Sequence, residues 1–295
     1  MFNIIKNKKL KRFIIINLIL VCIGLIIVFI VNMLKDNYRN IYKLGDEVIF
    51  EQTYNTIFNE IDIDSKMTDI YIRESNENNV RVVIYGEKEY FNVSEKNNKL
   101  FIKNNKKNMI ALDFYSCISK IELFIPPHYN DLIRIDSEFG NLQVERFSNL
   151  KLNVEQEYGN FLGNEIYFLK LNNEYGNIQI EKINMVLIDS NSSNIKINNV
   201  DDLSIDSEFG NIEVENINKK LKLNVENGNI TINNLIIDTN SSIKANYGKI
   251  KIGKTNEIKI KTKTDRGKSK VKNNYKNSEI VLDIYNEKGD ITIDN

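Results

Sequence analysis

Apolar and polar residues alternate along the chain from about residue 130 to its end, and the alternation is interrupted by a recurring glycine. The clearest copies of the phrase around this glycine are Glu-Phe-Gly-Asn or Glu-Tyr-Gly-Asn, at 138–141, 157–160, 174–177 and 208–211. Positions seven and five before the glycine are apolar, as are positions two and four after it. An alternation of two is typical of a strand with one buried face. The pattern therefore predicts one strand before each glycine and another after it.

The glycine recurs every 17 to 22 residues, and we call each such position a corner. The corners are Gly140, Gly159, Gly176, Gly210, Gly228, Gly248, Gly267 and Gly289, with Ser193 in the remaining place. A short repeat of strands and tight bends predicts a solenoid in which each coil buries its apolar face against its neighbours. We expect a single-stranded, right-handed parallel β-helix over 128–295, with glycine at the corners because it adopts a positive φ without steric cost.

Residues 46–127 also contain strand-like segments but lack the glycine corner. The predicted strands are 61–63, 70–72, 80–85, 100–102 and 121–125. We interpret this part as irregular first coils or a cap that precedes the regular repeat.

An uncharged run of 22 residues, 13–34, predicts a single transmembrane helix, because about 20 apolar residues cross a bilayer. A cleaved signal peptide is the alternative, but its apolar core is shorter and ends in small residues. Residues 1–12 are basic, and 35–45 form a polar juxtamembrane linker. The positive-inside rule then predicts a cytoplasmic N-terminus and an extracellular β domain.

Composition argues against several kinds of site. The chain has two cysteines and one histidine, His128, so a clustered zinc site is not expected. No nucleophile motif or phosphate-binding loop accompanies His128. We therefore expect no catalytic residues, no cofactor, no metal and no nucleic-acid partner.

Three sets of residues recur around the corners and would form columns in a stacked solenoid. Glutamates two before the corner could recruit cations, although a solvated face is the simpler reading. Aromatic residues just before the corner could bind sugars or could simply stack on one another. Asparagines just after it predict a ladder of amides, as in other stacked strands. The glutamates are Glu138, Glu157, Glu174, Glu208 and Glu226, the aromatics Phe139, Tyr158, Tyr175, Phe209 and Tyr247, and the asparagines Asn141, Asn160, Asn177, Asn194, Asn211 and Asn229.

Lysines concentrate near the C-terminal end, in the run IKIKTKTDRGKSKVK. They alternate with residues that would point inward, so they would line one outer face. A basic edge can discourage strands from associating end to end. The functional alternative is contact with envelope polyanions through Lys259, Lys261, Lys263 and Lys268.

The layout resembles a bacterial family of β-strand-repeat proteins that are usually labelled putative adhesins. Three segments carry the resemblance: FNEIDIDSKMTDIYIRESNENNVRVVIYG at 58–86, KLFIKNN at 99–105 and IELFIPPHYNDLIRIDSEFGN at 121–141, followed by the repeats. That family includes the membrane-anchored accessory protein of an envelope-stress operon in Bacillus-like bacteria. The resemblance implies a β-helix at the cell surface and supplies no catalytic residues. It leaves two roles open: adhesion, or an accessory part in envelope sensing with a membrane protein partner.

Overall fold

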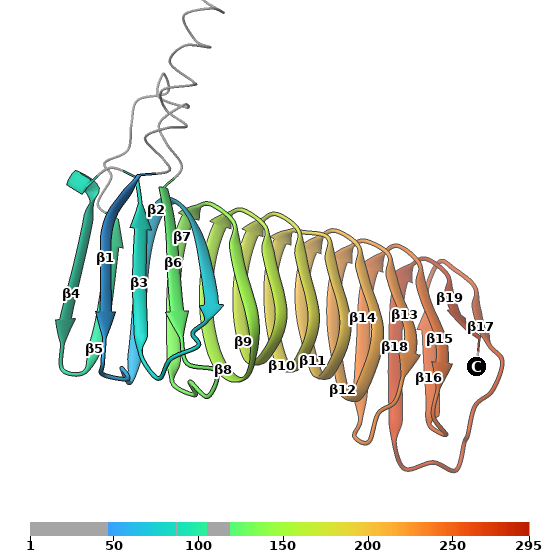
Figure 1. Ribbon diagram of the computed structural model, residues 1–295. Helices are drawn as coiled ribbons and strands as arrows, with labels where there is room; N and C mark the ends of the chain where they lie inside the picture. Colours follow the sequence, from blue (N-terminus) through green and yellow to red (C-terminus); the bar gives the residue numbers. More distant parts are fainter. Residues whose placement is uncertain (1–46, 87, 105–118, 295) are drawn as a thin grey trace, which may run out of the picture. The chain divides into compact units, whose positions relative to one another are not determined.

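The computed structural model describes residues 47–86, 88–104 and 119–294. Within this part the chain is an all-β, right-handed solenoid of about nine turns (Figure 1). It contains no α-helix in those residues, and only a 3-10 turn at Lys88–Tyr90. The solenoid belongs to one compact unit, Val48–Asn108 with Ile118–Asn295. The all-β solenoid predicted from the repeat is therefore confirmed.

Long strands that pair in parallel build the regular part of the solenoid. They are β8 (Leu142–Tyr158), β9 (Phe161–Tyr175), β10 (Ile178–Ser192), β11 (Ile195–Phe209) and β12 (Ile212–Asn227). Each runs from one corner to the next. The two strands expected per coil therefore form one continuous strand, which bends between them. Equivalent residues lie side by side, such as Ile178 beside Phe161 and Ile195.

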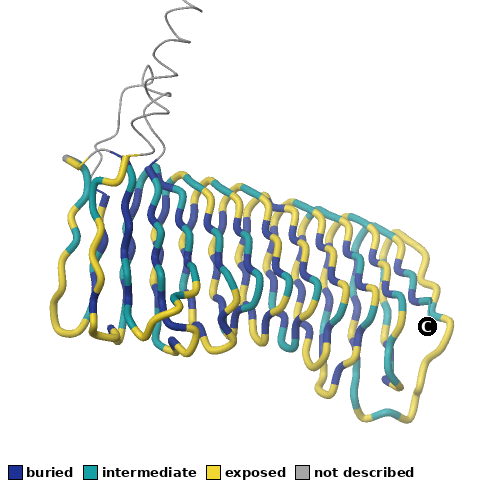
Figure 2. The backbone as a smooth tube through the Cα atoms, viewed as in Figure 1, coloured by how far each residue is buried: buried dark blue, intermediate teal, exposed yellow. Residues whose placement is uncertain are grey.

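The buried apolar side chains form one core cluster along the unit. Figure 2 shows buried residues recurring from coil to coil. Ile180, Ile197 and Val214, which occupy equivalent positions in successive coils, are all buried. A fully buried aliphatic side chain contributes roughly 1.5–3 kcal/mol, and each coil supplies several of them. The stacking of coils is therefore driven by the apolar positions that the sequence repeats.

Strands at both ends of the regular part are shorter. Before it lies β7 (Leu132–Phe139), and after it lie β13 (Ile230–Leu235), β14 (Ser241–Tyr247) and β15 (Ile250–Thr255). β14 pairs with β12, and β15 pairs with β13, so the parallel stacking continues across the interruption at residues 236–240.

The last two coils stack in reverse order, which the repeat did not predict. They consist of β16 (Lys259–Thr264) with β17 (Ser269–Val271), and β18 (Val281–Lys288) with β19 (Ile291–Ile293). β18 pairs with both β14 and β16, and β19 pairs with both β15 and β17 (Figure 1). The C-terminal coil is therefore inserted into the stack, and β16 and β17 form its free end.

Antiparallel pairs close the opposite end of the solenoid. The strands there are β1 (Val48–Tyr54), β2 (Glu60–Glu74), β3 (Val80–Tyr85), β4 (Phe91–Lys96), β5 (Lys99–Asn104) and β6 (Ser119–Ile125). β5 and β6 stack in parallel on β2, whereas β4 is antiparallel to β5, and β1 and β3 continue antiparallel from β6. β2 also pairs in parallel with β7, the strand at which the regular stack begins.

Candidate ligand-contact surface

Each corner glycine sits directly against the corner of the neighbouring coil. A Cβ added to Gly159, Gly176 or Gly210 would lie 1.9 Å from the carbonyl oxygen of the adjacent corner residue, and φ at these three is strongly positive. At Gly228, Gly267 and Gly289, φ lies outside the positive region. The expectation that a positive φ explains the glycine is therefore wrong at these three corners. The close approach persists at all three, with distances of 1.8, 2.1 and 1.7 Å. Backbone proximity is therefore the requirement that the corners share, and Gly140 and Gly248 satisfy it in the same way.

Ser193 occupies a corner by turning its side chain into the solenoid. The residue is buried, and its hydroxyl donates to Asn173 Oδ1 at 2.7 Å while accepting from Ser190 Oγ at 2.7 Å. Its φ is not positive, unlike that of Gly176 and Gly210 on either side. A non-glycine corner is tolerated because the side chain points away from the adjacent corner and finds polar partners inside.

Asn173 and Ser190 belong to a column of inward-pointing polar side chains, each three residues before a corner. This column was not identified from the sequence. Gln156 Nε2 donates to the Gly140 carbonyl at 2.7 Å, and Asn286 Nδ2 donates to the Gly248 carbonyl at 2.9 Å. Asn173 bridges coils by donating to Gln156 Oε1 at 3.2 Å. The signal was present as the repeated Ser, Gln or Asn at this position in an otherwise apolar alternation.

The asparagine ladder predicted after the corners is confirmed. Asn160 and Asn211 each receive the backbone N–H of the next residue in the column, Asn177 and Asn229, at 2.9 and 3.0 Å. The ladder starts at Asp69, which accepts from the backbone N–H of Asn141 at 2.7 Å. Most of these side-chain oxygens thereby satisfy a backbone donor that the tight corner leaves without a strand partner, whereas Asn177 Oδ1 accepts from the Asn194 side chain.

The aromatic column (Phe139, Tyr158, Tyr175, Phe209 and Tyr247) is stacked in one part and interrupted in another. The first three rings lie parallel, with centroids 4.8 and 5.0 Å apart and interplanar angles of 6°. Ser192 then separates Tyr175 from Phe209, and Asn227 separates Phe209 from Tyr247. All five side chains remain 41–51% exposed. The predicted structural stack is thus present for three rings only.

Carboxylates crowd the strands that lead into the corners. Asp136 on β7 lies beside Asp64 on β2 and Glu155 on β8. Partial desolvation, followed by repulsion from Asp64 and Glu155, raises the pKa of Asp136. The glutamates two before the corners line the same strands, with Asn191 interrupting their column. Within the described ranges, no group of three His, Cys, Asp or Glu side chains could hold a metal ion.

We expect Asp136→Asn to raise the melting midpoint by about 1–2 °C at pH 7, because surface substitutions change stability by roughly 0.5 kcal/mol. A raised pKa means that the folded state binds the proton more tightly, so the destabilisation is present at neutral pH and disappears below the ordinary aspartate pKa of about 3.9. Melting curves at several pH values would measure this. Asp189→Asn is the control, since Asn172 replaces one of the acidic neighbours there. A gain at neutral pH no larger than that of the control would contradict the prediction.

The predicted polyanion-contact lysines lie together at the free end of the stack. Lys259, Lys261 and Lys263 belong to β16, and Lys268 follows the Gly267 corner just before β17. We call these four the basic edge. Lys261, Lys263 and Lys268 are exposed and Lys259 is half-buried. Among the described strands, β16 pairs with β18 alone. On its other side, Asn274 accepts from the Ile260 N–H at 2.9 Å and donates to the Ile260 carbonyl at 2.7 Å, so the lysines frame a strand edge that is partly capped.

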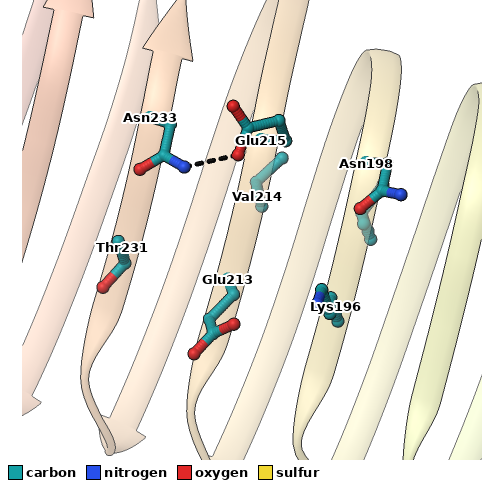
Figure 3. Close-up of a pocket in the computed structure, with 8 residues that line it drawn as sticks. Lys196, Asn198, Glu213, Val214, Glu215, Thr231 and Asn233 are labelled. Carbon is teal, nitrogen blue, oxygen red and sulfur yellow. Dashed lines mark hydrogen bonds between the residues drawn. The ribbon is translucent and has the colours of Figure 1, made fainter.

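Two shallow hollows run over the strands that follow the corners in the middle of the stack. One, of about 250 Å³, crosses β11, β12 and β13 (Figure 3). Polar side chains dominate its lining, and Asn233 there donates to Glu215. The other, of about 410 Å³, lies closer to the corners and shares Lys196 and Glu213 with the first. Sequence reasoning did not anticipate these hollows, because they depend on which side chains the coil register places side by side.

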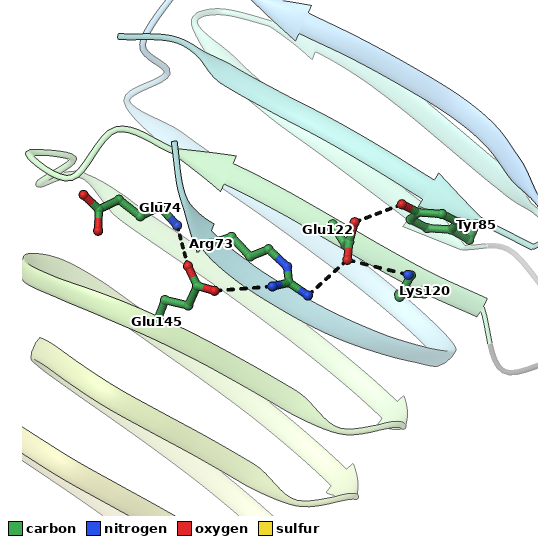
Figure 4. A network of polar contacts seen from close by, with 6 residues as sticks. All are labelled: Arg73, Glu74, Tyr85, Lys120, Glu122 and Glu145. Carbon is green, nitrogen blue, oxygen red and sulfur yellow. Dashed lines mark hydrogen bonds and ion pairs between the residues drawn. The ribbon is translucent and has the colours of Figure 1, made fainter. Parts of the chain in front are cut away.

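A polar network joins the cap to the first regular coils (Figure 4). Arg73 on β2 contacts Glu122 on β6 at 3.2 Å and Glu145 on β8 at 3.4 Å. Glu122 also accepts from the Tyr85 hydroxyl at 3.0 Å and pairs with Lys120 at 3.6 Å. Burial, followed by this contact with Glu122, raises the pKa of Tyr85. The network ties four strands together and needs no ligand to balance its charges.

The predicted membrane segment, 13–34, lies outside the described residues, as do 1–12 and the linker 35–45. Among the residues that are described, no helix is long and apolar enough to cross a bilayer.

Comparison with known proteins identifies a family and several similar folds. The Toastrack DUF4097 family matches residues 58–295. A putative adhesin from Bacteroides fragilis is 14% identical, with 85% of this chain and 98% of that chain covered and a TM-score of 0.33. A putative lipid binding protein from Parabacteroides distasonis is 15% identical, with 82% and 96% covered and a TM-score of 0.45. A putative adhesin from Parabacteroides merdae is 15% identical, with 83% and 95% covered and a TM-score of 0.42. No protein of curated function matches the chain by sequence.

Proposed function

Because the chain belongs to the Toastrack DUF4097 family, we propose that it is a non-enzymatic surface-interaction protein, anchored in the cell membrane by residues 13–34. The solenoid would lie outside the cell, with residues 1–12 in the cytoplasm. Its exposed columns of side chains would contact a partner, in the manner of an adhesin.

The observation that carries this proposal is the shape of the exposed surface. The corners align from coil to coil, so that each position of the repeat becomes a column of side chains about 4.8 Å apart. The connections between coils are short in the regular part, and the hollows found there are shallow and polar. An enzyme of this architecture would need loops long enough to build a cleft, whereas a binding surface needs only the aligned columns.

A protease-accessibility experiment tests the topology. A C-terminal tag on the full-length chain should be digested when protease is added to intact protoplasts, and a tag after the initiator Met should be protected. Digestion of a known cytoplasmic protein would reveal lysis and serves as the control. Protection of the C-terminal tag would overturn the extracellular placement and the surface role with it.

The second candidate function, an accessory factor in envelope sensing or maintenance, is favoured by the basic edge. Three of its four lysines lie on β16 and the fourth directly precedes β17, and the outer side of these two strands has no strand partner among the described strands. Anionic envelope polymers such as teichoic acids, or a membrane protein with an acidic surface, have the complementary charge. Crosslinking in living cells followed by mass spectrometry separates the two roles. A membrane partner would support the accessory role, and a partner on another cell or surface would support adhesion.

The basic edge also gives a prediction in vitro. Replacing Lys259, Lys261, Lys263 and Lys268 with Gln should weaken retention of the full-length protein on isolated cell walls by about tenfold at low salt, and the difference should shrink above about 0.5 M salt because surface charges are screened. Replacing Lys151, Lys170, Lys222 and Lys244, which lie on other strands, is the matched control. Equal retention of both variants would argue against polyanion contact at the edge.

A further inference from the structure

The aromatic column has a vacant place at Ser192. In the parallel register, Ser192 lies between Tyr175 of the preceding coil and Phe209 of the following one. Where the column is uninterrupted, consecutive rings lie 4.8 and 5.0 Å apart. Two coil steps therefore separate Tyr175 from Phe209, about 10 Å. The short serine side chain leaves a slot in which one further six-membered ring would have an aromatic neighbour on each side.

The rings that border this slot are open to a ligand. Phe209 is 51% exposed, the highest value in the column, and among the described residues no ring stacks on it. Tyr175 stacks on Tyr158 on one side only, so its other face is directed towards the slot. The second interruption, at Asn227, is more obstructed. The asparagine side chain there is larger than that of Ser192 and fills more of the gap between Phe209 and Tyr247.

Polar groups flank the Ser192 slot on both sides. Glu174 and Glu208 directly precede the two rings, and neither carboxylate is paired with a described residue. On the other side lie the ladder residues Asn177, Asn194 and Asn211. An amide nitrogen has two hydrogens, and the ladder contact from Asn194 Nδ2 to Asn177 Oδ1, at 3.4 Å, uses one of them. Carboxylate acceptors and amide donors therefore face solvent on opposite sides of one ring-sized gap.

The hollow of about 410 Å³ adjoins this slot. The same three asparagines line it, together with Gln179, Lys196 and Glu213. Figure 3 shows Lys196 and Glu213 side by side on neighbouring strands, at the edge that the two hollows share. The slot thus opens onto a polar surface that could hold further units of an extended ligand.

We propose that the Ser192 slot binds one sugar ring of a saccharide chain. A pyranose has apolar C–H faces, which would pack against Tyr175 and Phe209, and hydroxyl groups around its rim, which would meet the carboxylates and amides. An aromatic side chain of a peptide could fill the gap but would leave the polar flanks without partners. The saccharide therefore uses both features of the slot. This inference rests on the proposed surface role for access to a glycan, and it supplies the ligand class.

Saturation-transfer difference NMR on the full-length protein in lipid nanodiscs tests the proposal, because nanodiscs avoid sugar-based detergents. The probes are chitotriose, cellotriose and maltotriose, with N-acetyltyrosinamide as the aromatic comparison. We expect at least one trisaccharide to receive saturation at its ring C–H protons. Phe209→Ala should weaken its affinity by about two- to tenfold, the range expected for losing one aromatic contact.

Two variants separate the slot from the general stability of the stack. Ser192→Tyr supplies the missing ring, so it should abolish binding while leaving the melting midpoint unchanged or higher. Tyr158→Ala removes a ring from the uninterrupted part of the aromatic column, away from the slot, and should leave binding unchanged. Absence of transfer to all three trisaccharides, or equal binding by Ser192→Tyr, or stronger transfer to N-acetyltyrosinamide would overturn the proposal. Because the purified protein is used, these outcomes do not depend on the topology experiment, and failure of the surface role would be seen there instead.

Discussion

Gly176→Ala should destabilise the solenoid by about 3–4 kcal/mol, among the largest effects of any single methyl group in this chain. The new Cβ would lie 1.9 Å from the Gly159 carbonyl oxygen, and φ at this position is +144°. Relief would require neighbouring coils to separate, which breaks parallel backbone hydrogen bonds and opens the core between them. Urea denaturation of the purified full-length protein, followed by circular dichroism, measures the loss.

Gly163→Ala is the matched control for this prediction. Gly163 lies within β9, in the coil that precedes the Gly176 corner, and is buried. Its added Cβ would meet only the outer ends of the Ile166 and Phe161 side chains, at 2.8 and 3.1 Å. Such contacts relax by rotation of the side chains, so we expect a cost of about 1 kcal/mol. Equal losses for the two variants would show that the corner contact is not what limits the choice of residue.

Truncation after Ile280 should unfold more of the chain than it removes. The deleted residues carry β18 and β19, which lie inside the stack and are the strand partners of β16 and β17. Without them, residues 259–271 have no edge to pair with in their native register. We expect their hydrogen-exchange protection to fall by at least about a hundredfold, because a strand without a partner opens locally.

The same experiment discriminates between two arrangements of the final coils. If the coils stacked in sequence order, β16 would pair with β14, and the truncation would leave its protection intact. Protection in β9 to β11, several coils away, serves as the internal control and should not change. Retained protection over 259–271 would contradict the inserted position of the last coil.

Several properties of the fold could be predicted because they repeat. A single corner phrase is weak information, but nine copies at a steady interval require that equivalent residues stack. That requirement predicted the apolar core, the asparagine ladder and a stack of aromatic rings, of which three are found stacked. The strands expected within 61–125 are also found, in β2, β3, β5 and β6.

The candidate site depends on features that a repeat pattern does not contain. The Ser192 slot is a departure from the consensus, and its meaning comes from the two rings that the register places on either side of it. The inward polar column that contains Gln156 and Asn173 could not be predicted from the repeat either. A polar residue at a core position is interpretable only when the carbonyl it satisfies is known.

By itself, the sequence determined that the chain forms an all-β solenoid, where its corners fall and which residues line its core, because these follow from the period of the apolar positions. Only the tertiary structure decided the order of the last two coils, since strands with similar apolar patterns compete for the same place and the pattern cannot rank them. The tertiary structure also shows why glycine occupies the corners. The backbone of one coil passes within contact distance of the next, and that approach exists only once the coils are stacked.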